Sequence, residues 1–157
     1  MHLTDMSVLL IWLLLGVLGA LSKTDVPRYW ASKVFPETKS VYFLSKRRPR
    51  FSIHLMNELC KNIDGYLVEL DSLDEQNFVA GFLKAHTIYY AFTGANDIKR
   101  EGTFVFYNSK KLMPALKWLS HEPDNYNNKE DCVRIRPKGL NDISCKYRDH
   151  YICELRV

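Results

Sequence analysis

Four cysteines constrain this chain more than any other feature of its sequence, and all lie beyond residue 59: Cys60, Cys132, Cys145 and Cys153. An even number of cysteines in a small domain of an oxidising compartment favours disulfide bonds. Zinc binding through sulfur is disfavoured, because the chain has no CxxC spacing. We therefore expect two disulfides, and the residues alone leave three pairings open.

The start of the chain indicates that oxidising compartment. Residues 8–18 are almost entirely apolar and read VLLIWLLLGVL. A membrane-spanning helix needs about 20 apolar residues, whereas a run of this length is typical of a secretory signal peptide. Ala20 and Ser22 fit the −3 and −1 positions of a cleavage site, although the start MHLTDM lacks Lys and Arg. We predict a signal peptide over residues 1–22 and a secreted, extracellular mature chain, with an uncleaved anchor as the alternative.

The remaining residues have the length of one domain. Residues 23–37 are interpreted as an N-terminal leader and residues 38–157 as the folded domain. The formal net charge is only +4, and the basic run Lys46–Arg50 is short. A solvated turn is the preferred interpretation of that run, with a contact to an anionic surface as the alternative. No nucleic-acid partner and no membrane span in the mature chain are expected.

Two helices are predicted early in the domain. The first begins near Ser52, ends before Gly65, and places apolar side chains on one face at spacings of three and four: Ile53, Met56, Leu59, Cys60 and Ile63. The second begins with a capping box from Ser72 to Glu75 and continues through an apolar stripe: Phe78, Val79, Phe82 and Leu83.

Short strands account for the rest of the predicted fold. They are expected at residues 40–44, 66–70, 89–93, 103–107, 132–136 and 151–155. Residues 108–131 form a long segment without helical period, and such a segment inside a compact domain is usually functional. Helices followed by short strands and long loops indicate the α+β class.

Oxygen-bearing side chains gather in that loop and in a second stretch after Cys132. If Cys132 and Cys145 are bridged, the two stretches lie side by side. Five candidate ligands then become available to one ion: Glu122, Asp124, Glu130, Asn141 and Asp142. Calcium (Ca2+) prefers such oxygen donors, whereas zinc prefers His and Cys. An EF-hand loop is excluded, because Lys129 occupies the position where Gly is needed.

These residues, with the motifs around them, resemble the C-type lectin domain family over residues 38–155. The motifs follow one another in order: Cys60, Gly65-Tyr66-Leu67, Phe92-Thr93-Gly94-Ala95, Trp118, Glu122-Pro123-Asp124, Glu130-Asp131-Cys132-Val133, Asn141-Asp142-Ile143-Ser144-Cys145 and Tyr151-Ile152-Cys153-Glu154. The resemblance implies a C-type lectin-like fold, with two helices, small antiparallel sheets and a long ligand-binding loop. It also implies the short form of the domain, and the pairings Cys60–Cys153 and Cys132–Cys145.

The resemblance further implies how ligands are bound. The Glu122–Pro123 bond is expected to be cis, and the five candidate ligands are expected to hold calcium. Hydroxyls of a sugar then complete the coordination, and four side chains are expected to bind them: Glu122, Asp124, Glu130 and Asn141. A second calcium site is expected, with equal weight given to a solvated turn at residues 96–102. Its ligands are Asp97, Glu101, Asn125 and Glu130.

Two departures from the family pattern bear on ligand choice. The family pairs one acid with one amide in its sugar motif, whereas Glu122 and Asp124 are both acceptors when ionised. The sequence therefore leaves mannose-like and galactose-like preferences open. Leu140 stands where the family has a tryptophan before Asn-Asp.

The function expected from the sequence is a secreted, calcium-dependent lectin that binds glycans on cell or microbial surfaces. Host defence is a common role of such domains. The alternative is a C-type lectin-like module that binds proteins and not sugars. An enzyme with paired carboxylates, as in glycosidases, is ranked last, because calcium already accounts for these carboxylates. Assembly into an oligomer is allowed by the sequence and not required by it.

Overall fold

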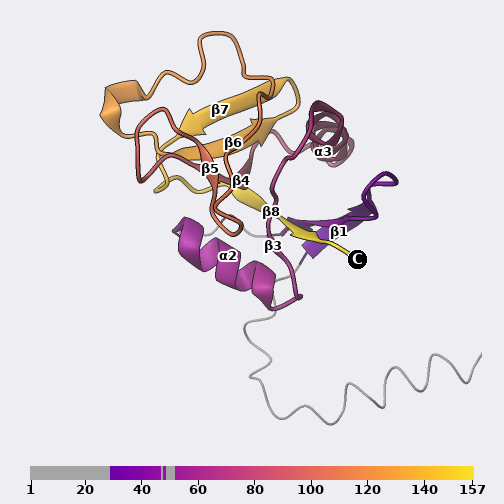
Figure 1. The fold of residues 1–157 in the computed structure, drawn as a ribbon. Coiled ribbons are helices and arrows are strands. Elements are labelled where there is room, and N and C mark those ends of the chain that lie inside the picture. The colour runs from indigo at the N-terminus through magenta and orange to yellow at the C-terminus, as the bar shows by residue number, and fades with distance from the viewer. Residues whose placement is uncertain (1–28, 47, 49–51) are drawn as a thin grey trace, which may run out of the picture.

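The computed structural model describes residues 29–46, 48 and 52–157 (Figure 1). The signal peptide expected at residues 1–22 lies outside the described residues, as do Arg47, Pro49 and Arg50 of the basic run. Within the described ranges, every helix is too short or too polar to cross a bilayer.

The strands form a connected sheet in the order β1-β2-β8-β4-β6-β7. These strands are β1 (Tyr29–Val34), β2 (Val41–Ser45), β4 (Ala91–Asn96), β6 (Cys132–Arg136), β7 (Gly139–Ile143) and β8 (His150–Leu155). Two short strands flank this path: β3 (Tyr66–Leu67) pairs with β8, and β5 (Val105–Phe106) pairs with β4. Strands β4 and β8 are parallel, and the other described pairs are antiparallel.

The two predicted helices are present. Helix α2 (Ile53–Lys61) begins after Ser52, whose hydroxyl accepts a hydrogen bond from the backbone N–H of Leu55 at 3.2 Å. Helix α3 (Leu73–Ala85) begins after Ser72, which accepts from the N–H of Glu75 at 3.1 Å. The Glu75 carboxylate reaches back one residue further than a capping box requires, and accepts from the N–H of Asp71 at 2.7 Å.

Each helix covers its own part of the core. Apolar side chains of α3 pack with residues of β2, β6, β7 and β8, including Val79, Phe82, Leu44, Ile135 and Ile152. Helix α2 packs over a second cluster, which includes Met56, Leu67, Phe92 and Tyr151. Figure 1 shows the two helices apart from each other, with strands of the sheet between them. The predicted α+β architecture is thereby confirmed.

Strands β1 and β7 were not expected from the sequence. Strand β1 lies inside the segment interpreted as a leader and forms an antiparallel hairpin with β2. Strand β7 carries Asn141 and Asp142 and pairs along its whole length with β6. The ligand motif of the sequence therefore lies on a strand of the sheet.

Both disulfides follow the pairing that the resemblance implied. Cys60 of α2 is bonded to Cys153 of β8, at a sequence separation of 93. Cys132 of β6 is bonded to Cys145 just beyond β7, at a separation of 13. Closing a loop of this smaller size stabilises a fold by roughly 3 kcal/mol in the chain-entropy model. The second disulfide therefore fixes β7, with its polar residues, against β6.

Two carboxylates, Glu75 and Glu154, lie inside the fold and are called the inner carboxylates below. Both oxygens of Glu154 are used: one accepts from Ser40 Oγ at 2.9 Å and Arg156 Nε at 3.0 Å, and the other from the N–H of Glu69 at 3.2 Å. Glu75 accepts from the Tyr42 hydroxyl at 2.5 Å as well as from Asp71. Burial raises the pKa of Glu75 to about 7.

Candidate metal and ligand site

The long loop is held against strand β7 just before it reaches its acidic residues. The N–H of Leu140 donates to the carbonyl of Lys117 at 2.9 Å, and the N–H of Leu119 donates to the carbonyl of Leu140 at 2.8 Å. A Cβ atom on Gly139 would lie 2.9 Å from the carbonyl carbon of Trp118, so glycine is needed for this approach. Leu140 is fully buried in the core. The core thus includes the residue that directly precedes Asn141 and Asp142.

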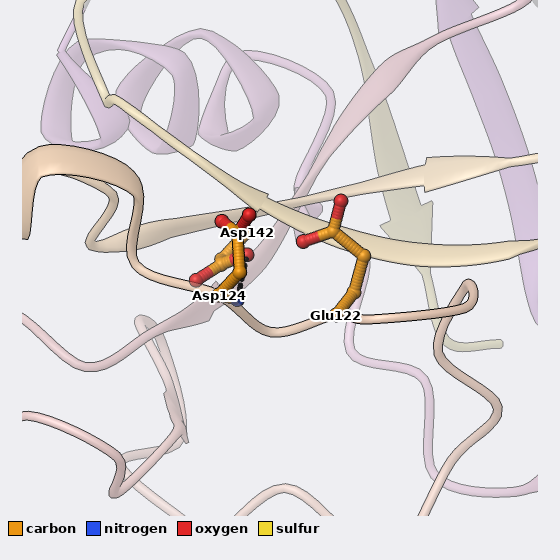
Figure 2. A group of neighbouring side chains, drawn as sticks. All are labelled: Glu122, Asp124 and Asp142. Carbon is orange, nitrogen blue, oxygen red and sulfur yellow. Dashed lines mark hydrogen bonds between the residues drawn. The ribbon is translucent and has the colours of Figure 1, made fainter.

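Three carboxylates meet where the loop crosses β7. The Glu122–Pro123 bond is cis, as the resemblance implied. Glu122, Asp124 and Asp142 each offer one oxygen, and these oxygens all lie within 4.8 Å of one another. Figure 2 shows Glu122 and Asp124 extending from the loop toward the strand that carries Asp142. These three side chains are called the loop carboxylates below.

Asp142 orders the loop through its backbone. One oxygen of Asp142 accepts from the N–H of Asp124 at 3.1 Å, and the other accepts from the N–H of Asn125 at 2.8 Å. Charge-assisted hydrogen bonds of this kind are stronger than neutral ones. Asp142 lies on β7, which is hydrogen-bonded to β6 along its whole length and is held next to it by the Cys132–Cys145 disulfide. The acidic turn at residues 122–125 is therefore bonded to a rigid part of the fold.

Glu122 has one oxygen in use and one without a partner. Its Oε1 accepts from the Asn141 amide nitrogen at 2.9 Å, whereas its Oε2 is buried with no hydrogen-bond partner among the described residues. Burial raises the pKa of Glu122 to about 7, and the neighbouring carboxylates Asp142 and Asp124 add to the rise. A buried, unpaired carboxylate oxygen is costly unless a cation or a proton neutralises it.

Glu130 borders the loop carboxylates without joining their group. Its Oε2 accepts from the N–H of Tyr126 at 3.1 Å, and Asp124 Oδ1 accepts from the same N–H at 3.2 Å. The N–H of Glu130 in turn donates to the side chain of Asn125 at 3.2 Å. Burial also raises the pKa of Glu130, and nearby Asp142 and Asp124 contribute. Two acids therefore share one donor at the outer edge of the site.

Asn141 turns its nitrogen, and not its oxygen, toward the loop carboxylates. Its Nδ2 donates to Glu122 and to the carbonyl of Asp142 at 2.5 Å. Its Oδ1 accepts from Arg134 Nε at 2.8 Å. The structure thus brings Asn141 into contact with the expected site and places its oxygen on the far side.

The residues of the expected second calcium site do not form a group of neighbouring carboxylates like the one formed by Glu122, Asp124 and Asp142. Asp97 is almost fully buried, with Oδ2 accepting from the N–H of Gly102 at 2.8 Å and Oδ1 without a partner in the described structure. Burial raises the pKa of Asp97, and the charges of Asp131 and Asp142 add to the rise. Glu101 is exposed, and among the described residues only the loop carboxylates form a group of three suited to a metal. The second calcium site stays a prediction.

Sequence analysis missed two residues that border the site. The backbone N–H of Tyr126 donates to both Asp124 and Glu130, and the Tyr126 side chain is 66% exposed. An aromatic residue within an Asn- and Asp-rich stretch was a sequence signal that could have identified Tyr126. Arg134 contacts Asn141 from strand β6, but an arginine on a strand has no pattern that would single it out.

The donor set fits a hard divalent cation. Three carboxylates within 4.8 Å of one another repel when all are ionised, and one oxygen among them is buried without a partner. Calcium takes six to eight oxygen ligands, including carboxylates that bind through one or both oxygens. No histidine or cysteine belongs to the group, so zinc is a poorer fit.

Fold and site together define a disulfide-bonded α+β binding module with an acidic ligand loop. The model of one protein family, the lectin C-type domain, matches residues 51–155. This match spans well over half of the chain, and the chain therefore belongs to the C-type lectin domain family. Domains of this family are binding modules and not enzymes, so the expectation that the chain is not an enzyme is confirmed.

Named relatives and solved structures agree with that membership. The chain is 35% identical over 77 residues to collectin-11 of Bos taurus, which covers 48% of this chain and 29% of the relative. It is 30% identical over 115 residues to the CD209 antigen of Homo sapiens, which covers 72% of this chain and 28% of the relative. The chain thus spans under a third of the length of both.

Among solved structures, human lithostathine superposes with a TM-score of 0.69 at 18% identity, covering 82% of this chain and 98% of that one. The carbohydrate-recognition domain of the mouse scavenger receptor C-type lectin gives 0.67 at 23% identity, covering 80% and 93%. At these identities, the likeness supports the fold.

Proposed function

We propose that this chain is a secreted, calcium-dependent lectin whose loop carboxylates hold the ion that binds sugar hydroxyls. The observation that carries the proposal is the group formed by Glu122, Asp124 and Asp142, with an unpartnered buried oxygen on Glu122. The proposed ion is held by these three side chains, with Glu130 beside them. Asn141, the fifth ligand expected from the sequence, contacts the group through its amide nitrogen in this structure. When bound, calcium supplies coordination positions for two neighbouring hydroxyls of a sugar.

The chain's own residues supply the rest of the recognition. Ionised Glu122 and Asp124 accept hydrogen bonds from sugar hydroxyls, and the Asn141 amide nitrogen is the donor nearest to Glu122. Tyr126 presents an exposed aromatic ring beside the same loop, suited to the apolar face of a sugar ring. One structural neighbour is a carbohydrate-recognition domain, and that is in line with a glycan ligand for this chain.

Affinity chromatography tests this function directly. The secreted protein is passed over mannose- and galactose-bearing resins in calcium and is then eluted with a chelator. Retention on one resin with release by chelator supports the lectin and identifies the sugar class. Retention that persists in chelator contradicts the role of the ion. The variant Asp124→Asn restores the acid–amide pairing of the family motif, and is expected to change the sugar preference and not to abolish binding.

A protein-binding module is the second candidate. The pairing of two acids in the motif Glu122-Pro123-Asp124 favours it, because both side chains accept and neither donates to a hydroxyl. Calcium binding without retention on either resin, or on a broad glycan array, would select this candidate. Failure of calorimetry to detect calcium would reject the proposed ion in both candidates.

A further inference from the structure

Arg134 is fixed on three sides beside the loop carboxylates. Its Nη1 forms an ion pair with Asp149 at 3.0 Å, and both side chains are largely buried. Its guanidinium carbon lies 4.3 Å from the centre of the Tyr90 ring, within the range of a cation–π contact. The third contact is Nε to Asn141 Oδ1 at 2.8 Å. The arginine is therefore held in place independently of Asn141.

The chemistry of arginine determines which way the Asn141 amide faces. A guanidinium carries only donors and is not deprotonated in proteins. The atom of Asn141 that faces Arg134 Nε must therefore be the oxygen, and the amide nitrogen must face Glu122. A carboxamide binds a cation through its oxygen. In this arrangement, Asn141 offers the loop carboxylates a donor and withholds its cation ligand.

We infer that Arg134 is a positioning residue that keeps Asn141 out of the cation's coordination shell and thereby lowers the affinity of the site for calcium. This inference rests on the proposed function, because it concerns the ion held by Glu122, Asp124 and Asp142. For Asn141 to bind the ion through its oxygen, the side-chain amide must rotate so that oxygen and nitrogen exchange places. That rotation leaves the buried Nε–H of Arg134 without an acceptor. When Arg134 is removed, the rotation leaves no donor unpaired, and Asn141 becomes an additional ligand.

Removing Arg134 also removes a positive charge near the ion, and a matched control separates that charge effect from the effect on Asn141. Arg136 lies two residues along the same strand, with its guanidinium carbon 4.8 Å from the same Tyr90 ring. It carries the same charge, and no hydrogen bond to Asn141 is found for it. Arg134→Met and Arg136→Met thus remove equal charge from the same strand and the same Tyr90 ring, and only the first frees the Asn141 oxygen.

The test is a double-mutant cycle read by calcium calorimetry on the mature chain with both disulfides intact. Arg134→Met is expected to bind calcium about tenfold more tightly than the wild type, and Arg136→Met within about twofold of it. Asn141→Ala is expected to cancel the gain, so that the double variant binds no more tightly than Asn141→Ala alone. The gain is diagnostic, because a purely structural role for Arg134 would weaken binding upon its removal.

Each outcome of the cycle supports or overturns the inference. Unchanged or weaker binding by Arg134→Met overturns it, as does an equal gain in Arg136→Met or a gain that survives Asn141→Ala. Binding by Arg134→Met where the wild type shows none supports it. Absence of calcium binding from every variant rejects the proposed function and the inference together, whereas wild-type binding with a flat cycle rejects the inference alone. If Arg134→Met fails to fold because Asp149 is left buried without its ion-pair partner, the cycle is run in an Asp149→Asn background.

Discussion

The inner carboxylates are almost fully buried, whereas the loop carboxylates range from buried Asp142 to exposed Asp124. The sharpest difference between the two groups is how the oxygens of Glu122 are used. Glu75 and Glu154 have both oxygens hydrogen-bonded to groups of the protein. Glu122, in contrast, leaves one buried oxygen without a partner in the described structure. A carboxylate whose two oxygens both accept hydrogen bonds from the chain stabilises the fold. A carboxylate with an oxygen that accepts no hydrogen bond can bind a ligand through that oxygen.

The comparison predicts that removing an inner carboxylate damages stability and leaves calcium binding intact. Glu154→Ala strands the Ser40 hydroxyl and the N–H of Glu69 and opens a cavity. We expect the free energy of unfolding to fall by about 3 kcal/mol, measured by urea denaturation. Glu58→Ala is the control, since its ion pair with Lys61 is exposed to solvent and such pairs contribute little to stability. A loss in Glu154→Ala no larger than in the control would contradict the assignment.

The loop carboxylates should show the opposite pattern. Glu122→Gln removes a charged ligand of nearly the same shape, and calcium affinity is expected to fall about 100-fold, or ~2.7 kcal/mol. Without calcium, this variant should be as stable as the wild type or more so, because it relieves repulsion from Asp142 and Asp124. Calorimetry and urea denaturation measure the two properties on one sample. Glu58→Gln, far from the loop in sequence and exposed, serves as the unaffected control.

A pH titration sharpens the contrast at Glu122. Because its pKa is raised to about 7 in the ion-free protein, a proton competes with calcium at neutral pH. Affinity should therefore fall as pH drops below about 7, by up to about tenfold per pH unit for one proton. Glu122→Gln should lose the part of this dependence that begins near pH 7. Equal affinities for the wild type at pH 7.5 and 5.5 would contradict the prediction.

The smallest expected effect concerns Glu75. Its folded-state pKa of about 7 lies above the ordinary value of 4.5, so folding favours its protonated form. The stability contributed by that proton is present below pH 4.5 and is lost as pH rises through about 7. In chelator, the wild type should lose about 1 kcal/mol more than Glu75→Gln between pH 6 and 7. Parallel profiles for the two proteins would place the titration elsewhere.

Local signals in the sequence predicted much of the fold and part of the site. The caps at Ser52 and Ser72, and the apolar spacing that follows each, are properties of neighbouring residues, so both helices were found. The disulfide pairing came from the family resemblance and is confirmed. The strands around Cys132 and Cys153 were found because β-branched and aromatic residues recur there.

What was missed depends on contacts between distant segments. Strand β1 is defined by its pairing with β2, and its sequence has no regular alternation. Strand β7 carries Asn141 and Asp142, and polar residues at these positions indicate a ligand motif before they indicate a strand. The orientation of the Asn141 amide depends on Arg134, seven residues away and across a ladder. No spacing rule encodes which end of an amide faces an ion.

The hairpin of β1 and β2 has a mechanical consequence. Strand β2 pairs with β8, so the first and last described strands belong to one three-stranded ladder. The Cys60–Cys153 bond ties helix α2 to the same strand β8. A pulling force applied at residues 29 and 157 would run through this ladder as shear between β1, β2 and β8. The acidic turn at residues 122–125, on the opposite side of β4 and β6 in the strand order, lies outside that load path. A domain tethered by its two ends could thus bear tension while its ligand loop keeps its shape.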